Sequence, residues 1–291
     1  MSIRFGTAGT SESFKAMGYK DSLDVPEYTA KFGLNAFEYQ CGRGVRLGEA
    51  KAKVMAQRAA ERDIRFSLHA PYFISMSSLE EEKRLNSLTY ILQSARIVDW
   101  MGGRRIVVHP GGLGGLSREG ATALAMDTLR RAQEALDAEG LSHIHICPET
   151  MGKINQLGDF DEVLTFCSVD DRFLPCVDFG HLNSRTMGQV NSRKAFAALL
   201  DEMENRLGRD RASRFHAHFS KIEYSAGGEK RHLTFADDFY GPEPEPLLEL
   251  LAERDWGPVL ICESCGTQAE DAAAMKTAYL AAKGVGKRLP E

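Results

Sequence analysis

Short runs rich in β-branched and aromatic residues alternate with longer amphipathic runs along nearly the whole chain. In the amphipathic runs 49–63, 80–102 and 121–140, apolar residues recur every three or four positions, which predicts helices. Strands that alternate with helices favour a parallel sheet. Eight such units within 291 residues fit an α/β fold of the (β/α)8 TIM barrel type, typically about 250 residues long, with a doubly wound open sheet as the second interpretation. The expected strands are 3–9, 36–40, 65–71, 105–111, 143–149, 175–181, 214–220 and 258–264.

The composition narrows the class of protein. Apolar residues make up 43% and charged residues 26% of the chain, as in an ordinary globular protein, and the net charge is −5. This charge gives no overall basic surface for nucleic acid, although a local basic patch is compatible with it. No apolar run approaches the roughly 20 residues of a membrane span, and the six cysteines are irregularly spaced. We expect a cytoplasmic monomer with reduced thiols, no membrane contact and a single domain over residues 1–291.

Histidines and carboxylates recur at the C-terminal ends of the expected strands. In a barrel these ends converge on one rim, where active sites are found. Ionisable side chains are rarely buried unless they are paired or bind a metal, so the set predicts a metal site. Histidine and carboxylate ligands suit Zn²⁺, Mn²⁺ or Fe²⁺, and there are too many for one ion. The residues are His69, His109, Glu149, Asp178, His181, His216, His218 and Glu263.

Six motifs carry a resemblance to a known family. They are HAPY (69–72), HPGG (109–112), CPET (147–150), VDFGH (177–181), HAHFSK (216–221) and ICES (261–264), and their order and spacing resemble those of the endonuclease IV family. That resemblance implies a TIM barrel that cleaves DNA on the 5′ side of abasic sites. It also implies two or three divalent metal ions, usually Zn²⁺. It implies one ion on His69, His109 and Glu149, and a second on Glu149, Asp178, His216 and Glu263. Glu149 and Glu263 would be the catalytic carboxylates, and His218 would contact ligands or substrate.

The loop AGGEKRHL (226–233) departs from the family pattern. The resemblance implies a third ion on His181 together with an Asp-x-His pair, and His232 falls on the histidine of that pair. Lys230 stands where the family has Asp, and an ammonium group cannot bind a metal. Three interpretations are open. Glu229 replaces the carboxylate, or the third site is weak or empty with Lys230 supplying positive charge, or the protein catalyses another reaction.

The resemblance also implies contacts with duplex DNA. Tyr72 falls where the family inserts a side chain into the duplex, and Arg43 or Arg46 lies in the loop that carries a second inserted residue. Lys221, Lys230 and Arg231 are candidates for phosphate contacts.

A second enzyme class fits part of the same set. Glu149, Asp178, His216 and Glu263 are similar to the four ligands of the sugar isomerases and epimerases among xylose isomerase-like barrels, which use one ion, often Mn²⁺. Lys230 and the pI of about 6.0 favour that alternative, in which the partner is a small sugar. The further histidines His69, His109, His181 and His232 favour the nuclease.

Overall fold

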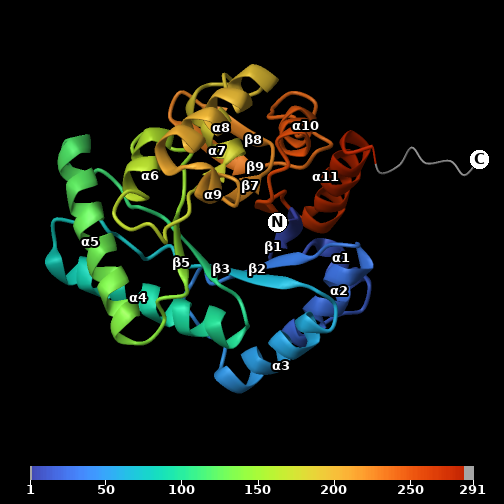
Figure 1. Ribbon diagram of the computed structural model, residues 1–291, viewed down its shortest axis with the longest axis horizontal. Coiled ribbons are helices and arrows are strands. Elements are labelled where there is room, and N and C mark those ends of the chain that lie inside the picture. The colour runs from blue at the N-terminus through green and yellow to red at the C-terminus, as the bar shows by residue number, and fades with distance from the viewer. Residues whose placement is uncertain (1, 285–291) are drawn as a thin grey trace, which may run out of the picture.

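The barrel consists of eight parallel strands, of which several are labelled in the central part of Figure 1. This computed structural model describes residues 2–284. The strand order is β5-β4-β3-β2-β1-β10-β7-β6, and an isolated parallel bridge between Glu149 and Cys176 joins the two end strands. The (β/α)8 prediction is therefore confirmed. The strands are β1 (Arg4–Ala8), β2 (Ala36–Gln40), β3 (Arg65–His69), β4 (Arg105–Val108), β5 (His145–Pro148), β6 (Cys176–Asp178), β7 (His216–Phe219) and β10 (Val259–Cys262).

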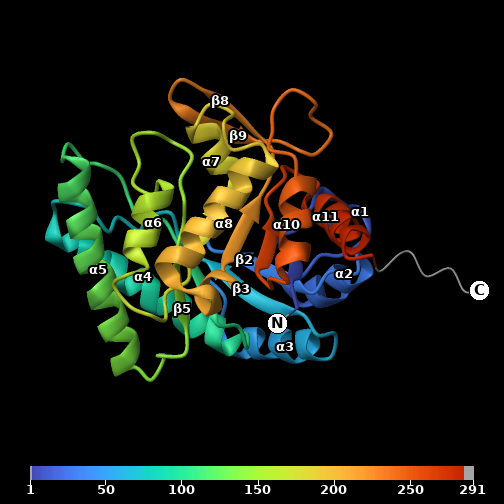
Figure 2. The ribbon, with the colours of Figure 1, turned by 45° about the horizontal axis from the view of Figure 1, so that its top comes forward.

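Helices surround the strands (Figures 1 and 2). The three clearest helical patterns are present as α3, α4 and α5, and α5 begins three residues earlier than expected because the Ser117 side chain caps it by accepting from Gly120 N. The helices are α1 (Glu12–Ala16), α2 (Val25–Lys31), α3 (Glu49–Ala60), α4 (Glu81–Trp100), α5 (Arg118–Ala138), α6 (Phe160–Phe166), α7 (Phe179–Arg185), α8 (Arg193–Leu207), α9 (Arg209–Ala212), α10 (Glu245–Arg254) and α11 (Gln268–Ala282), with a 3-10 turn η1 (Ser22–Asp24) before α2.

The predicted strand 175–181 is too long. β6 ends at Asp178, and α7 begins at the next residue. Asp178 Oδ1 accepts a hydrogen bond from His181 N at 2.7 Å, which caps α7 and turns the chain out of the sheet. His181 therefore lies in the first turn of a helix.

Close packing of strands and helices fixes the barrel. The larger of two apolar clusters extends from the strands to the outer helices and includes Phe5, Tyr28, Phe196 and Trp256. Gly6 lets β1 approach β2, because a Cβ at this position would lie 2.3 Å from Ala36 O. Strands that are buried on both faces explain why the sequence pattern reads as short apolar runs.

An antiparallel hairpin follows β7 at the C-terminal end of the barrel, at the top of Figure 2. It consists of β8 (Ile222–Ser225) and β9 (Gly228–His232). Glu223 pairs with Arg231, but Tyr224 pairs with Glu229, so Lys230 is the extra residue of a β-bulge. The loop AGGEKRHL is thus mostly a strand and its turn.

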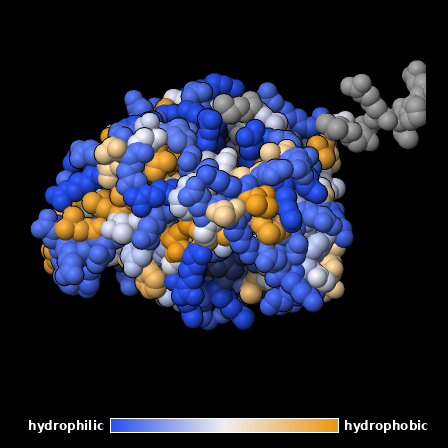
Figure 3. Space-filling view, turned by 90° about the horizontal axis from the view of Figure 1, so that it is seen from below, coloured by the Kyte–Doolittle hydropathy of each residue, from blue (hydrophilic) through white to orange (hydrophobic). Residues whose placement is uncertain are grey.

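The described helices include none that combines the length and apolar character needed to cross a membrane. On the face drawn in Figure 3, hydrophilic residues predominate, and apolar residues form patches between them.

Candidate metal centre

Glu149 lies at the centre of a cluster of histidines and carboxylates at the C-terminal ends of the strands. It follows β5 directly and is 1% exposed. Its Oε2 lies 3.2 Å from His69 Nε2 and 3.0 Å from His109 Nε2. His69 ends β3, and the residue after β4 is His109. Parallel neighbouring strands therefore bring together the three residues that the resemblance implies for a first ion, with ligand atoms within 4.8 Å of one another.

A second group shares Glu149 and adds Asp178, His218 and Glu263. His218 Nδ1 lies 2.9 Å from Glu149 Oε1 and 3.5 Å from Glu263 Oε1. Asp178 Oδ2 is buried and accepts no hydrogen bond from the described residues, and its ion-pair contact is with His181 Nδ1 at 3.3 Å. A buried carboxylate oxygen without a partner is costly unless a cation compensates it. This oxygen, buried without a hydrogen bond, is the observation that best fits a bound metal.

His218, not the expected His216, lies in this second group. Both residues point into the barrel because β-strand side chains alternate, but β7 pairs with β6 so that His218 is level with Asp178 and His216 is level with Cys176. His216 therefore lies one layer deeper. It forms a further group of donor atoms with Cys176 and His218, but burial raises the pKa of the Cys176 thiol well above its usual value, so this group is a weaker metal site.

Glu38, in the middle of β2, supports both histidines and was not singled out from the sequence. It is fully buried, and its Oε2 accepts hydrogen bonds from Ser67 Oγ at 2.8 Å and from His216 Nε2 at 2.9 Å. Its Oε1 lies 2.9 Å from His218 Nε2. A carboxylate behind a ligating histidine fixes the ring and its tautomer. The available signal was a glutamate inside the apolar run AFEYQ.

The third group is His181, Glu229 and His232. His181 Nδ1 forms a hydrogen bond with Thr150 O at 2.9 Å, and its Nε2 lies 3.4 Å from Glu229 Oε2. His232 Nδ1 forms a hydrogen bond with Ser220 Oγ at 2.8 Å, and its Nε2 lies 3.9 Å from Glu229 Oε1. Both rings thus present Nε2 to the same carboxylate. Of the three interpretations of the loop, this geometry matches the one in which Glu229 replaces the family Asp.

The β-bulge explains how Glu229 can reach this position. In a regular strand Lys230 and His232 would share a face, because side chains alternate. The extra residue shifts this alternation, so that Glu229 and His232 face the site. Lys230 Nζ instead lies 2.6 Å from Glu223 Oε1 on the exposed side, a position that does not match the interpretation in which Lys230 supplies charge to the site. Gly152 leaves the necessary room, since a Cβ there would lie 2.6 Å from the Cβ of Glu229.

The charges at the centre depend on one another. Burial would raise the pKa of Glu149, but the adjacent histidines hold it well below its usual value. Burial lowers the pKa of His69 and His181, yet the neighbouring carboxylates outweigh it and raise each pKa to about 9. Burial raises the pKa of Glu263. Without a metal, protonated histidines therefore neutralise the carboxylates, and a divalent cation can take their place.

The candidate DNA-contacting residues differ in exposure and in whether they already pair with a protein carboxylate. Tyr72 is 55% exposed, and its backbone N donates to Gly42 O at 3.4 Å, which places the loop with exposed Arg43 beside it on the rim. Lys221 is 4% exposed, donates to Asp237 O at 2.6 Å and pairs with Glu243, so the expected contact with phosphate does not fit its position. Arg231 and Lys230 both pair with Glu223.

A sequence model of the family described as xylose isomerase-like TIM barrel matches residues 26–282. An uncharacterized protein of Methanocaldococcus jannaschii is 34% identical over 260 residues, which cover 89% of this chain and 91% of that protein. A probable endonuclease 4 of Acholeplasma laidlawii is 27% identical over 179 residues, 60% of this chain and 58% of that protein.

Solved structures share the fold at lower identity. A D-tagatose 3-epimerase-like protein has a TM-score of 0.72 and 19% identity, covering 98% of this chain and 100% of that one. Endonuclease IV from Thermus thermophilus has a TM-score of 0.64 and 16% identity, covering 97% of this chain and 99% of that one. These similarities span both enzyme classes considered above, and the level they share is the family: this chain belongs to the xylose isomerase-like TIM barrel family.

Proposed function

We propose that this protein is a metal-dependent phosphodiester hydrolase that cleaves duplex DNA on the 5′ side of abasic sites. The observation that carries the proposal is the presence of three adjoining ligand groups, of which the first two share Glu149. A sugar isomerase with one ion needs only the second group. Such an enzyme would have no ligand role for the residues of the other two groups, namely His69, His109, His181, Glu229 and His232.

The chemistry that bound divalent ions supply to such a centre is neutralisation of phosphate charge and a bound water of lowered pKa. His69 and His109 would bind an ion on the side of the centre next to β3 and β4. Glu149 belongs to this group and also to the group that contains Asp178. Glu263 lies on the more open side, 14% exposed, where it can accept a hydrogen bond from the attacking water and orient it. His181, Glu229 and His232 would face the departing oxygen.

The rim supplies two candidates for DNA contact. Exposing an abasic nucleotide costs a few kcal/mol, which side chains that fill the gap can offset. Tyr72 and Arg43 project from neighbouring rim loops and suit this role.

The test is cleavage of a duplex that carries one abasic analogue, with Zn²⁺ or Mn²⁺ present. We expect a nick on the 5′ side, and we expect Glu149→Ala to abolish it. His143→Ala is the matched control, because His143 is an exposed histidine that pairs with Asp99 outside the centre. Failure to cleave with either metal would refute the proposal.

A ketose epimerase is the second candidate, with a divalent ion on Glu149, Asp178, His218 and Glu263. Two observations favour it: this group is complete by itself, and the rim cations Lys221, Lys230 and Arg231 are engaged by protein carboxylates. His109→Ala separates the two functions, since His109 belongs to the first group alone. It should strongly impair a nuclease, whereas an epimerase should keep most of its activity on a ketose.

A further inference from the structure

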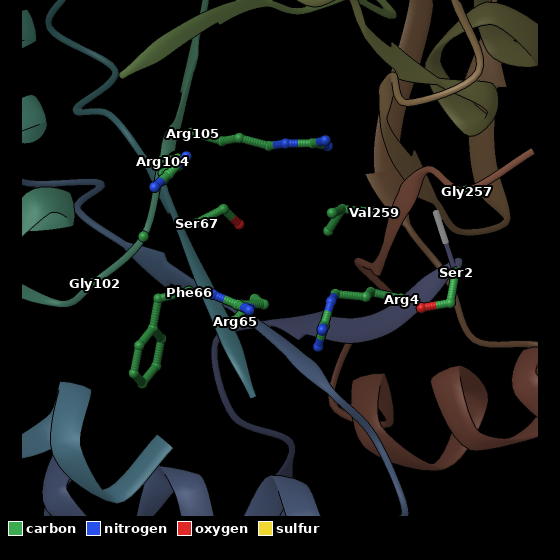
Figure 4. A pocket seen from close by; sticks show the side chains of 11 residues that line it. Ser2, Arg4, Arg65, Phe66, Ser67, Gly102, Arg104, Arg105, Gly257 and Val259 are labelled. Carbon is green, nitrogen blue, oxygen red and sulfur yellow. The ribbon is translucent and has the colours of Figure 1, made fainter. Parts of the chain in front are cut away.

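The N-terminal end of the barrel contains a cavity of about 490 Å³, at the opposite end from the metal centre. Its wall includes the first residues of four strands, namely Arg4 of β1, Arg65 of β3, Arg105 of β4 and Val259 of β10. Figure 4 shows Arg4, Arg65, Arg105 and Ser67 around a common space, with Phe66 pointing away from it.

Four arginines line this cavity: Arg4, Arg65, Arg104 and Arg105. Among the described residues that line it there is no Asp or Glu. Asp63 outside the lining pairs with Arg4 at 3.0 Å, and the part of the chain from residue 2 to 284 offers the other three no ion pair. Four arginines around one cavity give it a local positive potential, which attracts anions although the net charge of the chain is −5.

Two of the arginines are held in position by the protein. Arg105 donates to Phe215 O at 3.0 Å and to Arg214 O at 2.8 Å, and Arg4 donates to Asn35 O at 3.1 Å. Burial lowers the pKa of Arg105, and the nearby Arg214 adds to this effect. These contacts orient the two guanidinium groups.

Arg65 and Arg104 differ from them. Both are exposed, and neither guanidinium makes a hydrogen bond or ion pair with any residue in the described range 2–284. The forked donors of arginine match the oxygens of a phosphate, with two parallel hydrogen bonds per group. The cavity volume falls within the range of about 300–1,000 Å³ that is usual for small organic ligands.

We propose that this cavity binds a small phosphorylated organic molecule, with Arg65 and Arg104 holding its phosphate group. Neither residue contacts the metal centre, so the site is separate from the proposed hydrolase activity.

The test is calorimetric titration of the metal-loaded protein with AMP, ribose 5-phosphate and inorganic phosphate, with adenosine as the uncharged probe. We expect one AMP or ribose 5-phosphate per chain, bound at least about tenfold more tightly than adenosine or inorganic phosphate. The double variant Arg65→Ala, Arg104→Ala should weaken this binding at least about tenfold, as expected for lost charge-assisted hydrogen bonds. The matched control is Arg62→Ala, Arg130→Ala, which removes two exposed arginines that do not line the cavity.

Three outcomes would overturn the proposal. The first is that the wild type binds neither organic phosphate. The second is that the double variant binds as the wild type does, which would show that Arg65 and Arg104 do not hold the ligand. The third is inorganic phosphate binding as tightly as AMP and ribose 5-phosphate, which would make the free anion the ligand. Circular dichroism melting of the double variant should match the wild type, because both side chains are exposed and unpaired within the described residues.

Discussion

The substitution of Glu38 tests whether the carboxylate beneath the candidate metal centre sets the tautomer of His218. The substitution Glu38→Gln keeps the size of the side chain but removes its charge. The adjacent imidazoles hold the pKa of Glu38 well below its usual value against the effect of burial, so the wild-type group is ionised at neutral pH. A carboxylate 2.9 Å from His218 Nε2 favours a proton on that nitrogen, which leaves the Nδ1 lone pair free for the second ligand group.

The expected magnitude follows from these contacts. A glutamine amide can donate toward His218 Nε2, which favours the tautomer with its proton on Nδ1, and that tautomer cannot bind a metal through Nδ1. Loss of such support typically lowers metal affinity about 10- to 100-fold, or about 1.4–2.8 kcal/mol. Because Glu38 also accepts from Ser67 and His216 inside the barrel, the metal-free protein should lose about 1–3 kcal/mol of unfolding free energy.

Competition with a fluorescent chelator measures the Zn²⁺ affinity, and urea unfolding of the metal-free protein measures the free energy. The matched control is Glu82→Gln, which changes an exposed glutamate in the first turn of α4. We expect neither quantity to change in the control. Wild-type Zn²⁺ affinity in Glu38→Gln, with the protein folded, would refute the role assigned to Glu38.

Four further predictions concern the histidines and the hairpin. Metal uptake at pH 7.5 should release protons from His69 and His181, whose pKa is about 9 in the metal-free state, and calorimetry in buffers of different ionisation enthalpy would detect this. Because each folded-state pKa lies above the unfolded value of about 6.5, these groups should stabilise the metal-free protein fully below pH 6.5 and lose that effect as pH rises through 9, which thermal melts can follow. Glu229→Ala should reduce the bound metal by one ion per chain as counted by elemental analysis, whereas Lys230→Ala should not; equal counts would contradict the assignment of Glu229. Gly152→Ala should displace Glu229 and mimic its loss, and a crystal structure with Glu229 unmoved would disprove this.

Much of the candidate centre follows from local sequence. The alternation of strand and helix patterns predicts the barrel, and a barrel brings the C-terminal ends of all its strands to one rim. His69, His109, Glu149 and Glu263 stand at or just after strand ends, so their convergence needs only correct strand boundaries. All strands of the barrel run in the same direction, so a residue at the C-terminal end of any of them lies on the same rim.

The remaining assignments were decided by tertiary structure. His216 and His218 point the same way from β7, and only the register against β6 determines which of them is level with Asp178. Glu38 acts from β2, far from the other residues in sequence, and Lys221 is buried by contacts that the hairpin and its following loop create.

The stretch AGGEKRHL separates the two sources of information most clearly. Its sequence alone identifies His232 as a candidate ligand and Lys230 as incompatible with the family pattern. Which neighbour faces the site depends on the bulge at Lys230, which arises from pairing with the adjacent strand β8, and on the space beside Gly152, which lies far away in the sequence. The sequence determines the type of each side chain. The packing of the strands determines how deep a side chain lies, which way it points and which residues it contacts. At this candidate centre these three properties bring His218 and Glu229 into the ligand groups.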